Sequence, residues 1–258
     1  MAIFFSKLKP HHHYVILLLS FTIILCLYID NSRVSKPAAC VNRTCAPDTE
    51  RTNWFCARFA PTVQLLLNSR NSRLSADVSS WWRGLQNVNR VANYTTLVKN
   101  LFQLFPNQEH CSGSHPNHCR TCAVVGNSGN LLGSRYGPLI DSKDCVMRTY
   151  TDVPSTINGN KDKVMILHPE FMKYVHVNWT EYHGSYPSTG FLMVIFALHI
   201  CDEVHVFGFG ATKDGNWHHY FDKTLTPYAN ESHAGDFEYK TISRLHWGKN
   251  LLMYKGWT

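Results

Sequence analysis

The hydrophobic pattern begins with an apolar run near the N-terminus. Residues 14–29 form sixteen positions without a charge, preceded by Lys7 and Lys9 and closed by Asp30. A membrane-spanning helix needs about 17–25 apolar residues, so this run lies near the lower limit. Positive charge before the run places the N-terminus in the cytosol. The pattern therefore predicts a cytosolic tail over 1–13 and a signal-anchor transmembrane helix after it, with a cleaved signal peptide as the alternative.

Beyond this run the pattern predicts a stem and then one α/β domain. Residues 30–53 are polar and carry two prolines, as a stem does. From 54 to about 105 apolar residues recur at helical spacing, which predicts two or three helices. Later apolar runs predict a strand that starts at Cys122 and ends in a Gly-Asn-Ser-Gly-Asn turn, a strand over 164–168, a buried helix over 189–201 and a strand over 203–207. Strands that alternate with helices predict an α/β fold with a mostly parallel sheet over 54–258.

Composition narrows the class of partner. Hydrophobic residues make up 44% of the 258 residues and charged residues 17%, which excludes a globally disordered chain. The net charge of +7 favours anionic partners such as nucleotide-sugars or anionic lipid. No run or stripe of Lys and Arg accompanies this excess, so we expect no nucleic-acid role.

Cysteines and glycosylation sequons agree with a lumenal domain. Eight of the nine cysteines lie beyond the apolar run, and an even set in the secretory pathway predicts disulfides. Four Asn-x-Ser/Thr sequons predict N-glycans at Asn42, Asn93, Asn178 and Asn230.

Two clusters carry candidate chemistry. The Gly-Asn-Ser-Gly-Asn turn over 126–130 follows a strand, where open α/β sheets bind nucleotides and phosphates, although a plain tight turn has the same pattern. The second cluster is Trp217-His-His-Tyr220 followed by His233 and Glu238. Its histidines suit a general base or a metal ligand, but the spacing fits no common zinc pattern, and structural histidines remain the alternative.

Both clusters resemble sequence motifs of a known protein family. The run CAVVGNSGN over 122–130, continued to Arg148, resembles the large sialyl motif of animal sialyltransferases. Residues 183–210 resemble the small sialyl motif and WHHYFD over 217–222 the third motif. His233 and Glu238 resemble the very-small motif. The sequence of these motifs is most similar to that of the β-galactoside α-2,3-sialyltransferases that act on Galβ1-3GalNAc.

The resemblance implies a fold and a mechanism. It implies a GT-A-like, Rossmann-like α/β domain that uses CMP-sialic acid without a metal or other cofactor and inverts the anomeric centre. In that reading His233 is the general base, His219 binds the CMP phosphate and Glu238 supports the structure around His233. Positions that match donor-contacting residues are Asn127, Ser188, Thr189, Gly190 and Gly210, and those that match acceptor-contacting residues are Gln86 and Tyr186.

The resemblance also implies covalent links and a location. It implies disulfides Cys122–Cys201 and Cys40–Cys45, whereas the family partner of Cys119 is missing and Cys56 or Cys111 could replace it. It implies a single-pass type II Golgi membrane protein that acts on galactose-terminated O-glycans or glycolipids. A homodimer is one assembly that we consider.

The chain departs from the family after Arg148. The family has an asparagine there that contacts the donor, and this chain has Thr149-Tyr150 followed by a short link over 151–160. Family-like sequence resumes at Lys161, so several tens of residues, including sheet strands, are expected to be missing. Two functions follow. One is an active sialyltransferase, and the other is an inactive or truncated relative that serves as a Golgi glycan-binding or partner protein.

Overall fold

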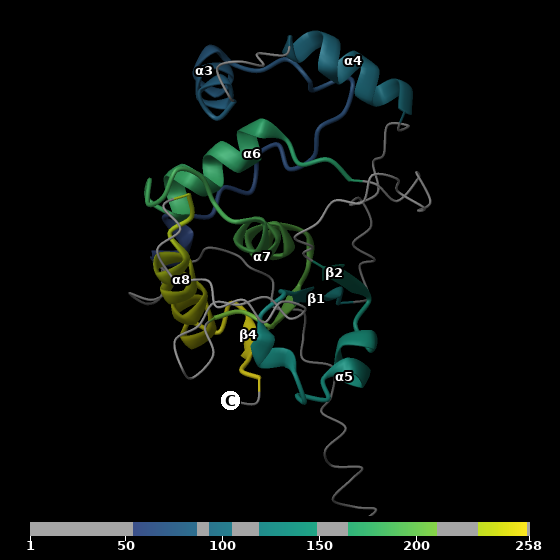
Figure 1. Cartoon of the computed structure of the whole chain (residues 1–258), viewed down its shortest axis with the longest axis vertical. Helices are drawn as coiled ribbons and strands as arrows, with labels where there is room; N and C mark the ends of the chain where they lie inside the picture. Colours follow the sequence, from purple (N-terminus) through teal and green to yellow (C-terminus); the bar gives the residue numbers. More distant parts are fainter. Residues whose placement is uncertain (1–53, 87–92, 105–118, 149–164, 211–231, 257–258) are drawn as a thin grey trace, which may run out of the picture. The chain divides into compact units, whose positions relative to one another are not determined.

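A computed structural model describes residues 54–86, 93–104, 119–148, 165–210 and 232–256 (Figure 1). The predicted cytosolic tail, membrane helix and stem lie outside these residues. Within them, no helix combines the length and the apolar character that a bilayer crossing requires. The helices and strands, in chain order, are α3 (Ala76–Gly84), α4 (Tyr94–Leu104), β1 (Thr121–Val125), the 3₁₀ turn η1 (Gly129–Leu131), α5 (Gly137–Asp141), β2 (Cys145–Arg148), α6 (Pro169–Tyr174), the π-helix η3 (Val175–Trp179), α7 (Thr189–Ile200), β3 (Glu203–Phe207), α8 (Gly235–Trp247) and β4 (Leu252–Tyr254).

The described strands form one parallel sheet in the order β2-β1-β3-β4. Strand β1 is paired on both sides, with Cys122 opposite Cys145 of β2 and opposite Val204 of β3. Its three middle residues are buried, as expected for a central strand of a parallel sheet. The α/β class and the mostly parallel sheet predicted from the sequence are therefore confirmed.

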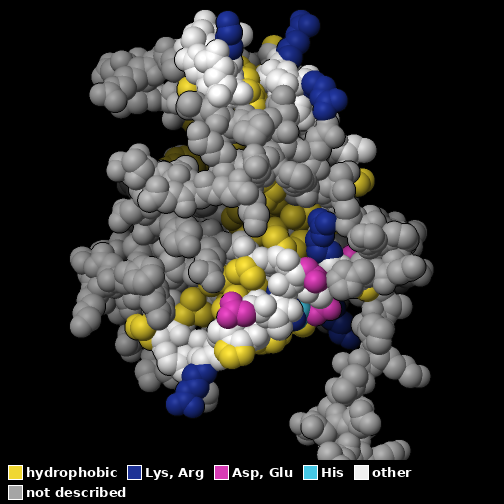
Figure 2. Space-filling model, turned by 90° about the vertical axis from the view of Figure 1, so that its right-hand side faces the viewer, with side chains coloured by type: hydrophobic (Ala, Val, Ile, Leu, Met, Phe, Trp, Pro, Cys, Tyr) yellow, Lys and Arg dark blue, Asp and Glu magenta, His cyan; other side chains and the backbone are white. Residues whose placement is uncertain are grey.

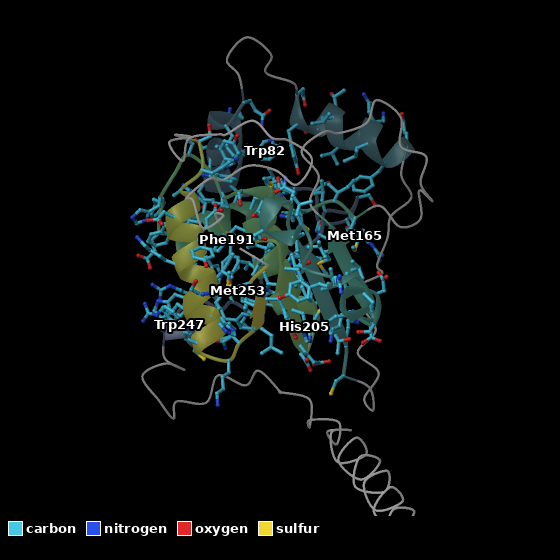
Figure 3. All side chains as sticks on the ribbon, turned by 60° about the horizontal axis from the view of Figure 1, so that its bottom comes forward. Trp82, Met165, Phe191, His205, Trp247 and Met253 are labelled. Atoms are coloured by element: carbon cyan, nitrogen blue, oxygen red, sulfur yellow. A yellow bond between two sulfur atoms is a disulfide. The ribbon has the colours of Figure 1, made fainter. Side chains whose placement is uncertain are left out.

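Helix α7 forms the centre of the hydrophobic core. Its residues are apolar all round, which is typical of a helix buried on every side. It packs against β1 and β3, and Phe191 and Ile195 are fully buried there, whereas Trp247 at the end of α8 is 70% exposed (Figure 3). The predicted disulfide between Cys122 of β1 and Cys201, the residue that ends α7, is present and ties the helix to the sheet.

The two or three helices predicted over 54–105 are found as α3, α4 and a short helical turn at 54–56, whereas one predicted strand differs in the structure. Between the helical turn at 54–56 and α3, where Pro61 stands, the chain continues as turns. There Leu66 forms an antiparallel bridge with Leu167, and the Leu67 N–H donates to Ile166 O at 2.8 Å. The strand predicted over 164–168 is, in its described part, only this bridge, because His168 caps helix α6 and Pro169 starts it.

Basic, acidic and hydrophobic side chains are interspersed on the described surface. Figure 2 shows Lys and Arg side chains in separate places on one face, with hydrophobic and acidic side chains between them. Exposed large hydrophobic residues include Leu97, Leu132, Tyr182 and Tyr186. Single exposed hydrophobic residues are normal on a protein surface and identify no site by themselves.

The strand order reverses between β1 and β3. From β1 the chain moves outward to β2, and then returns through α6 and α7 to the other side of β1, where β3 and β4 follow. In open parallel sheets, ligands bind outside the carboxyl ends of the strands at such a reversal. The fold therefore indicates the two loops that follow β1 and β3 as the place of a ligand site.

Candidate active site

The loops after β1 and β3 are bonded to each other at this reversal. The Gly126 N–H donates to Phe207 O at 2.8 Å and the Ser128 N–H to Gly208 O at 3.1 Å. The Ser128 hydroxyl donates to Gly210 O at 2.8 Å. These bonds join the predicted large and small motifs into one rigid edge of the sheet.

Glycines let the two loops approach this closely. A Cβ on Gly126 would lie 2.3 Å from Gly208 O, which no side chain could tolerate. Gly210 has φ +93°, a conformation that other residues rarely adopt, and a Cβ there would lie 2.5 Å from the ring of Tyr239. Gly126 is therefore required by a backbone contact, and Gly210 by its positive φ.

Asn130 has an acceptor that remains unused. Its side-chain N–H donates to Phe209 O at 3.0 Å, which fixes the orientation of the amide. Its Oδ1 is buried and has no hydrogen-bond partner among the described residues. An unsatisfied buried acceptor costs about 1–3 kcal/mol, which a ligand hydroxyl or amino group could recover. The sequence reading singled out Asn127 in this loop and missed Asn130; a second amide in a loop after a strand was the available signal.

Ser188 and Glu238 join the start of α7 to the first turn of α8. Glu238 is only 6% exposed, and its two carboxylate oxygens accept from the Ser188 N–H at 2.7 Å and from the Ser188 hydroxyl at 2.6 Å. The same hydroxyl accepts from the Phe191 N–H at 3.1 Å and so caps α7. Burial raises the pKa of Glu238, and the Ser188 bonds and nearby His233 oppose that rise.

His233 lies against Tyr186. Its Nδ1 is 3.0 Å from the Tyr186 carbonyl oxygen, and the two rings meet edge to face with centroids 4.7 Å apart. A carbonyl only accepts, so Nδ1 must carry the hydrogen. The lone pair of a neutral His233 is then on Nε2, which is the state that a general base requires.

Backbone contacts hold this histidine in place. The Ser185 N–H donates to Ser232 O at 3.0 Å. Gly184, with φ +73°, approaches so closely that a Cβ there would lie 2.8 Å from Ala234 N. His183 stacks on Phe237 of α8 with centroids 3.9 Å apart. The small-motif and very-small-motif segments thus form one substructure around the candidate base.

The structure places most of the predicted site residues in these two regions. Asn127 follows β1, Ser188 caps α7, Thr189 and Gly190 start it, and Gly210 is the last described residue after β3. Gln86 lies just after α3, and its hydrogen bonds are local, to Trp82 and Arg83. The residues that lie outside the described part of the chain are His219, Cys40, Cys45, Asn42 and Asn230.

The remaining cysteines and sequons are placed only in part. Cys56 and Cys119 are both disulfide-bonded, and Cys145 is the free thiol of the described residues. Asn93 is exposed, and its side-chain oxygen accepts from the Thr96 N–H. Asn178 is half-buried in η3 beside fully buried Trp179.

The fold is of the α/β class, and the site combines a glycine-rich edge of the parallel sheet with a candidate histidine base. The family model for glycosyltransferase family 29, the sialyltransferases, matches residues 66–151 and 149–249. The chain belongs to this family.

Individual relatives give the same assignment. The chain is 35% identical to mouse CMP-N-acetylneuraminate-beta-galactosamide-alpha-2,3-sialyltransferase 1, over 87% of this chain and 86% of that protein. It is 34% identical to the human protein of that name, over 87% and 85%. A crystal structure of a mammalian sialyltransferase aligns with TM-score 0.72 and 34% identity, over 86% of this chain and 99% of the other. A mammalian sialyltransferase in complex with Gal-beta-1-3GalNAc-ortho-nitrophenol aligns with TM-score 0.70, over 81% and 97%.

The alignments also differ in length. The alignment with the mouse enzyme runs over 288 residues, whereas 87% of the 258 residues of this chain is about 224, a difference of about 64. The family model matches in two parts that meet at 149–151.

Proposed function

We propose that this sialyltransferase transfers sialic acid from CMP-sialic acid to the 3-hydroxyl of the galactose in Galβ1-3GalNAc on glycoproteins or glycolipids. The observation that carries the proposal is the His233 tautomer, which leaves Nε2 free as a base beside Tyr186. The relatives named for beta-galactosamide alpha-2,3 transfer support the linkage, and the structural neighbour bound to a Gal-beta-1-3GalNAc compound supports the acceptor.

The chemistry is one inverting displacement. Nε2 of His233 takes the proton from the acceptor hydroxyl while that oxygen forms a bond to the anomeric carbon of sialic acid. The bond from this carbon to the CMP phosphate oxygen breaks, and CMP leaves with the electron pair. The Tyr186 carbonyl stabilises the resulting imidazolium, because its bond from Nδ1–H strengthens when the ring becomes positive.

The donor is held at the carboxyl edge of the sheet. The first N–H groups of a helix lack intrahelical acceptors; Phe191 N–H is capped by Ser188, which leaves those of Thr189 and Gly190 for a phosphate oxygen. The unsatisfied Oδ1 of Asn130 suits a hydroxyl or amino donor of the cytidine. Asn127 and Gly210 complete this proposed surface, with His219 on the phosphate and no metal or other cofactor taking part.

Anchoring and location remain part of the proposal. We place the chain in the Golgi membrane as a single-pass type II protein whose catalytic domain is a lumenal GT-A-like domain shortened between about 150 and 161. The two-part family match and the alignment lengths support this shortening. The second candidate is an inactive relative that binds glycans or a partner protein, and it is favoured by the position of the shortening, directly after strand β2.

The test is sialyl transfer by the full chain in Golgi-type membranes. Labelled CMP-sialic acid and Galβ1-3GalNAc are supplied to membranes with the wild-type chain, His233→Ala or Lys249→Ala, an exposed residue near the C-terminus. We expect transfer with the wild type and the Lys249 control and a loss of at least about 100-fold with His233→Ala, the scale of general-base catalysis. Membranes that contain the folded wild type and transfer nothing would favour the inactive relative.

A further inference from the structure

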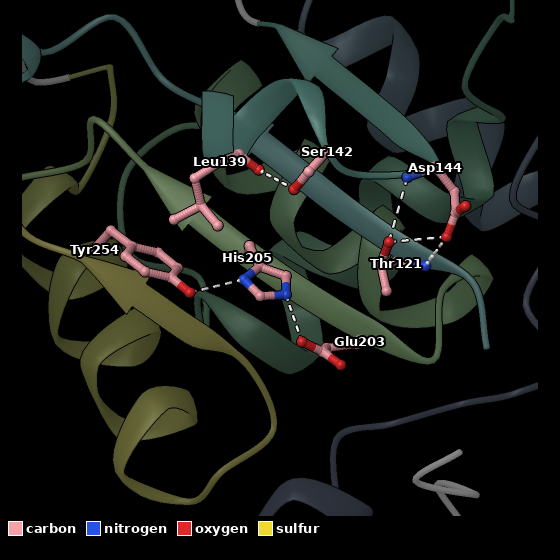
Figure 4. A network of polar contacts seen from close by, with 7 residues as sticks. All are labelled: Thr121, Leu139, Ser142, Asp144, Glu203, His205 and Tyr254. Carbon is pink, nitrogen blue, oxygen red and sulfur yellow. Dashed lines mark hydrogen bonds and ion pairs between the residues drawn. The ribbon is translucent and has the colours of Figure 1, made fainter. Parts of the chain in front are cut away.

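Strand β4 is fixed to the sheet by aromatic side chains. The Tyr254 ring stacks on Phe207 of β3 with centroids 4.5 Å apart, and its hydroxyl lies 3.0 Å from Nδ1 of His205 (Figure 4). Glu203 accepts a hydrogen bond from Nε2 of His205, and burial lowers the pKa of His205, so the ring is neutral with its hydrogen on Nε2. Nδ1 is then an acceptor, and the Tyr254 hydroxyl donates to it. The last residue of β4 is therefore held at a defined position.

The residues after β4 contact the loop after β1. The Tyr136 hydroxyl donates to Lys255 O at 2.6 Å, and the Tyr136 ring packs against Tyr254 with centroids 5.7 Å apart. At Gly256, a Cβ would lie 1.6 Å from Asn130 O and 2.3 Å from Asn130 C. No side chain fits there, so the backbone of residues 255–256 lies directly on the backbone of Asn130. We call residues 255–256 the C-terminal tail.

Asn130 is consequently held between two segments. On one side its side-chain N–H donates to Phe209 O in the loop after β3, and on the other side the C-terminal tail contacts its carbonyl. Its Oδ1 is buried and has no hydrogen-bond partner among the residues that the structure describes. A shift of the tail would move the carbonyl and, through the same residue, this acceptor.

We infer that the C-terminal tail is a positioning element of the donor site, with Gly256 as the residue that allows its contact with Asn130. This inference rests on the proposed function, in which the loop after β1 binds the cytidine nucleotide. The tail acts on nucleotide affinity and not on the galactose acceptor, because in the described part of the chain no hydrogen bond or ring contact joins it to Tyr186 or His233. Those two residues are held instead by Ser232, Ser185 and the start of α8.

Two changes separate this role from general stability. Gly256→Ala inserts a Cβ against Asn130, and Tyr136→Phe removes only the hydroxyl that bonds to Lys255 while keeping the ring. Gly84→Ala is the matched control, because a Cβ at Gly84 would meet no atom within 4 Å. The full chain is purified in detergent, and the Kd for CMP, the KM for Galβ1-3GalNAc and the unfolding temperature are measured for each protein.

We expect Gly256→Ala to weaken CMP binding at least about tenfold and Tyr136→Phe about 2–10-fold, the value of one hydrogen bond. The acceptor KM should change less than twofold, and Gly84→Ala should bind CMP as the wild type does. If Gly256→Ala does not fold, a chain that ends at Tyr254 replaces it, and the same loss of CMP affinity is expected. Unchanged CMP affinity in the tail variants, or equal losses for CMP and acceptor, would overturn the inference. A folded wild type that binds no CMP would overturn the proposed function as well. This failure differs from a failure of the inference alone, in which the wild type binds CMP and the tail variants bind it equally well.

Discussion

Replacing Glu238 by glutamine keeps the size of the side chain and removes its charge. In the structure both carboxylate oxygens accept from Ser188, at 2.7 and 2.6 Å, in a position that is 6% exposed. Glutamine retains one acceptor oxygen and places an amino group opposite the Ser188 hydroxyl. That hydroxyl already accepts from the Phe191 N–H, so its own hydrogen loses its acceptor. One bond to a charged group disappears and the other becomes a bond between neutral groups.

The expected cost is about 2 kcal/mol. A hydrogen bond to a charged group contributes about 1.5–3 kcal/mol, and removing the buried charge returns part of this because its desolvation is relieved. For a domain of this size 1 kcal/mol shifts the unfolding temperature by about 2–4 °C, so we expect a decrease of about 4–8 °C. Because Ser188 caps α7 and Glu238 lies five residues after His233 in the first turn of α8, we also expect kcat/KM for sialyl transfer to fall about tenfold or more.

The assay is thermal unfolding and sialyl transfer of the purified full chain, with Asp236→Asn as the control. Asp236 lies in the same helical turn, but its ion pair with Lys240 is exposed and contributes little. We expect Asp236→Asn to unfold within about 2 °C of the wild type, since an exposed i,i+4 pair contributes about 0.3–0.5 kcal/mol. If Glu238→Gln unfolds and reacts like this control, the Ser188–Glu238 contact does not support the site and the reasoning is wrong.

Three further predictions concern the frame of the site. Replacing both Cys122 and Cys201 by alanine opens a loop of 79 residues, and we expect the free energy of unfolding in urea to fall by about 2–5 kcal/mol; an equal urea midpoint would contradict this. Burial lowers the pKa of His205, so below about pH 6.5 the unfolded chain binds a proton that the folded chain does not, and stability falls as the pH falls from 7 to 5. His205→Gln should reduce this slope, and comparing the two proteins cancels the opposite contribution of the buried carboxylate in α8, whose raised pKa favours the folded state at low pH. Asn93 is exposed and Asn178 half-buried, so on a gel Asn93→Gln should remove one glycan from the chain expressed in cells that N-glycosylate, and Asn178→Gln none; a mobility shift for Asn178→Gln alone would reverse this assignment.

Local sequence patterns determined the strands and the buried helix of the site. The apolar runs predicted the strand from Cys122, the helix over 189–201 and the strand over 203–207, and β1, α7 and β3 lie there. Such runs are short, apolar and bounded by glycine or polar turns, so their conformation depends mainly on local composition. The family motifs, which are also read locally, identified the sialyltransferase family.

Local patterns failed where contacts between distant segments decide the conformation. The helical spacing from 54 to about 105 included Val63, Leu66 and Leu67, but these residues lie outside the helices, and Leu66 and Leu67 bond instead to the segment 166–167. A periodic apolar pattern shows only that a segment is buried on one side, and the partner determines whether it is helical or extended.

The sequence by itself determined that this chain has an α/β domain with sialyl motifs, a candidate base at His233 and a disulfide suggested by the family. Only the tertiary structure decided which nitrogen of His233 is free, because that depends on the Tyr186 carbonyl 3.0 Å away. It also decided that Glu238 bonds to Ser188 and that Gly256 lies on Asn130. These contacts join residues separated by tens to more than a hundred positions, so no local pattern specifies them. They form only when the strands assemble and bring distant segments close together at the carboxyl edge of the sheet.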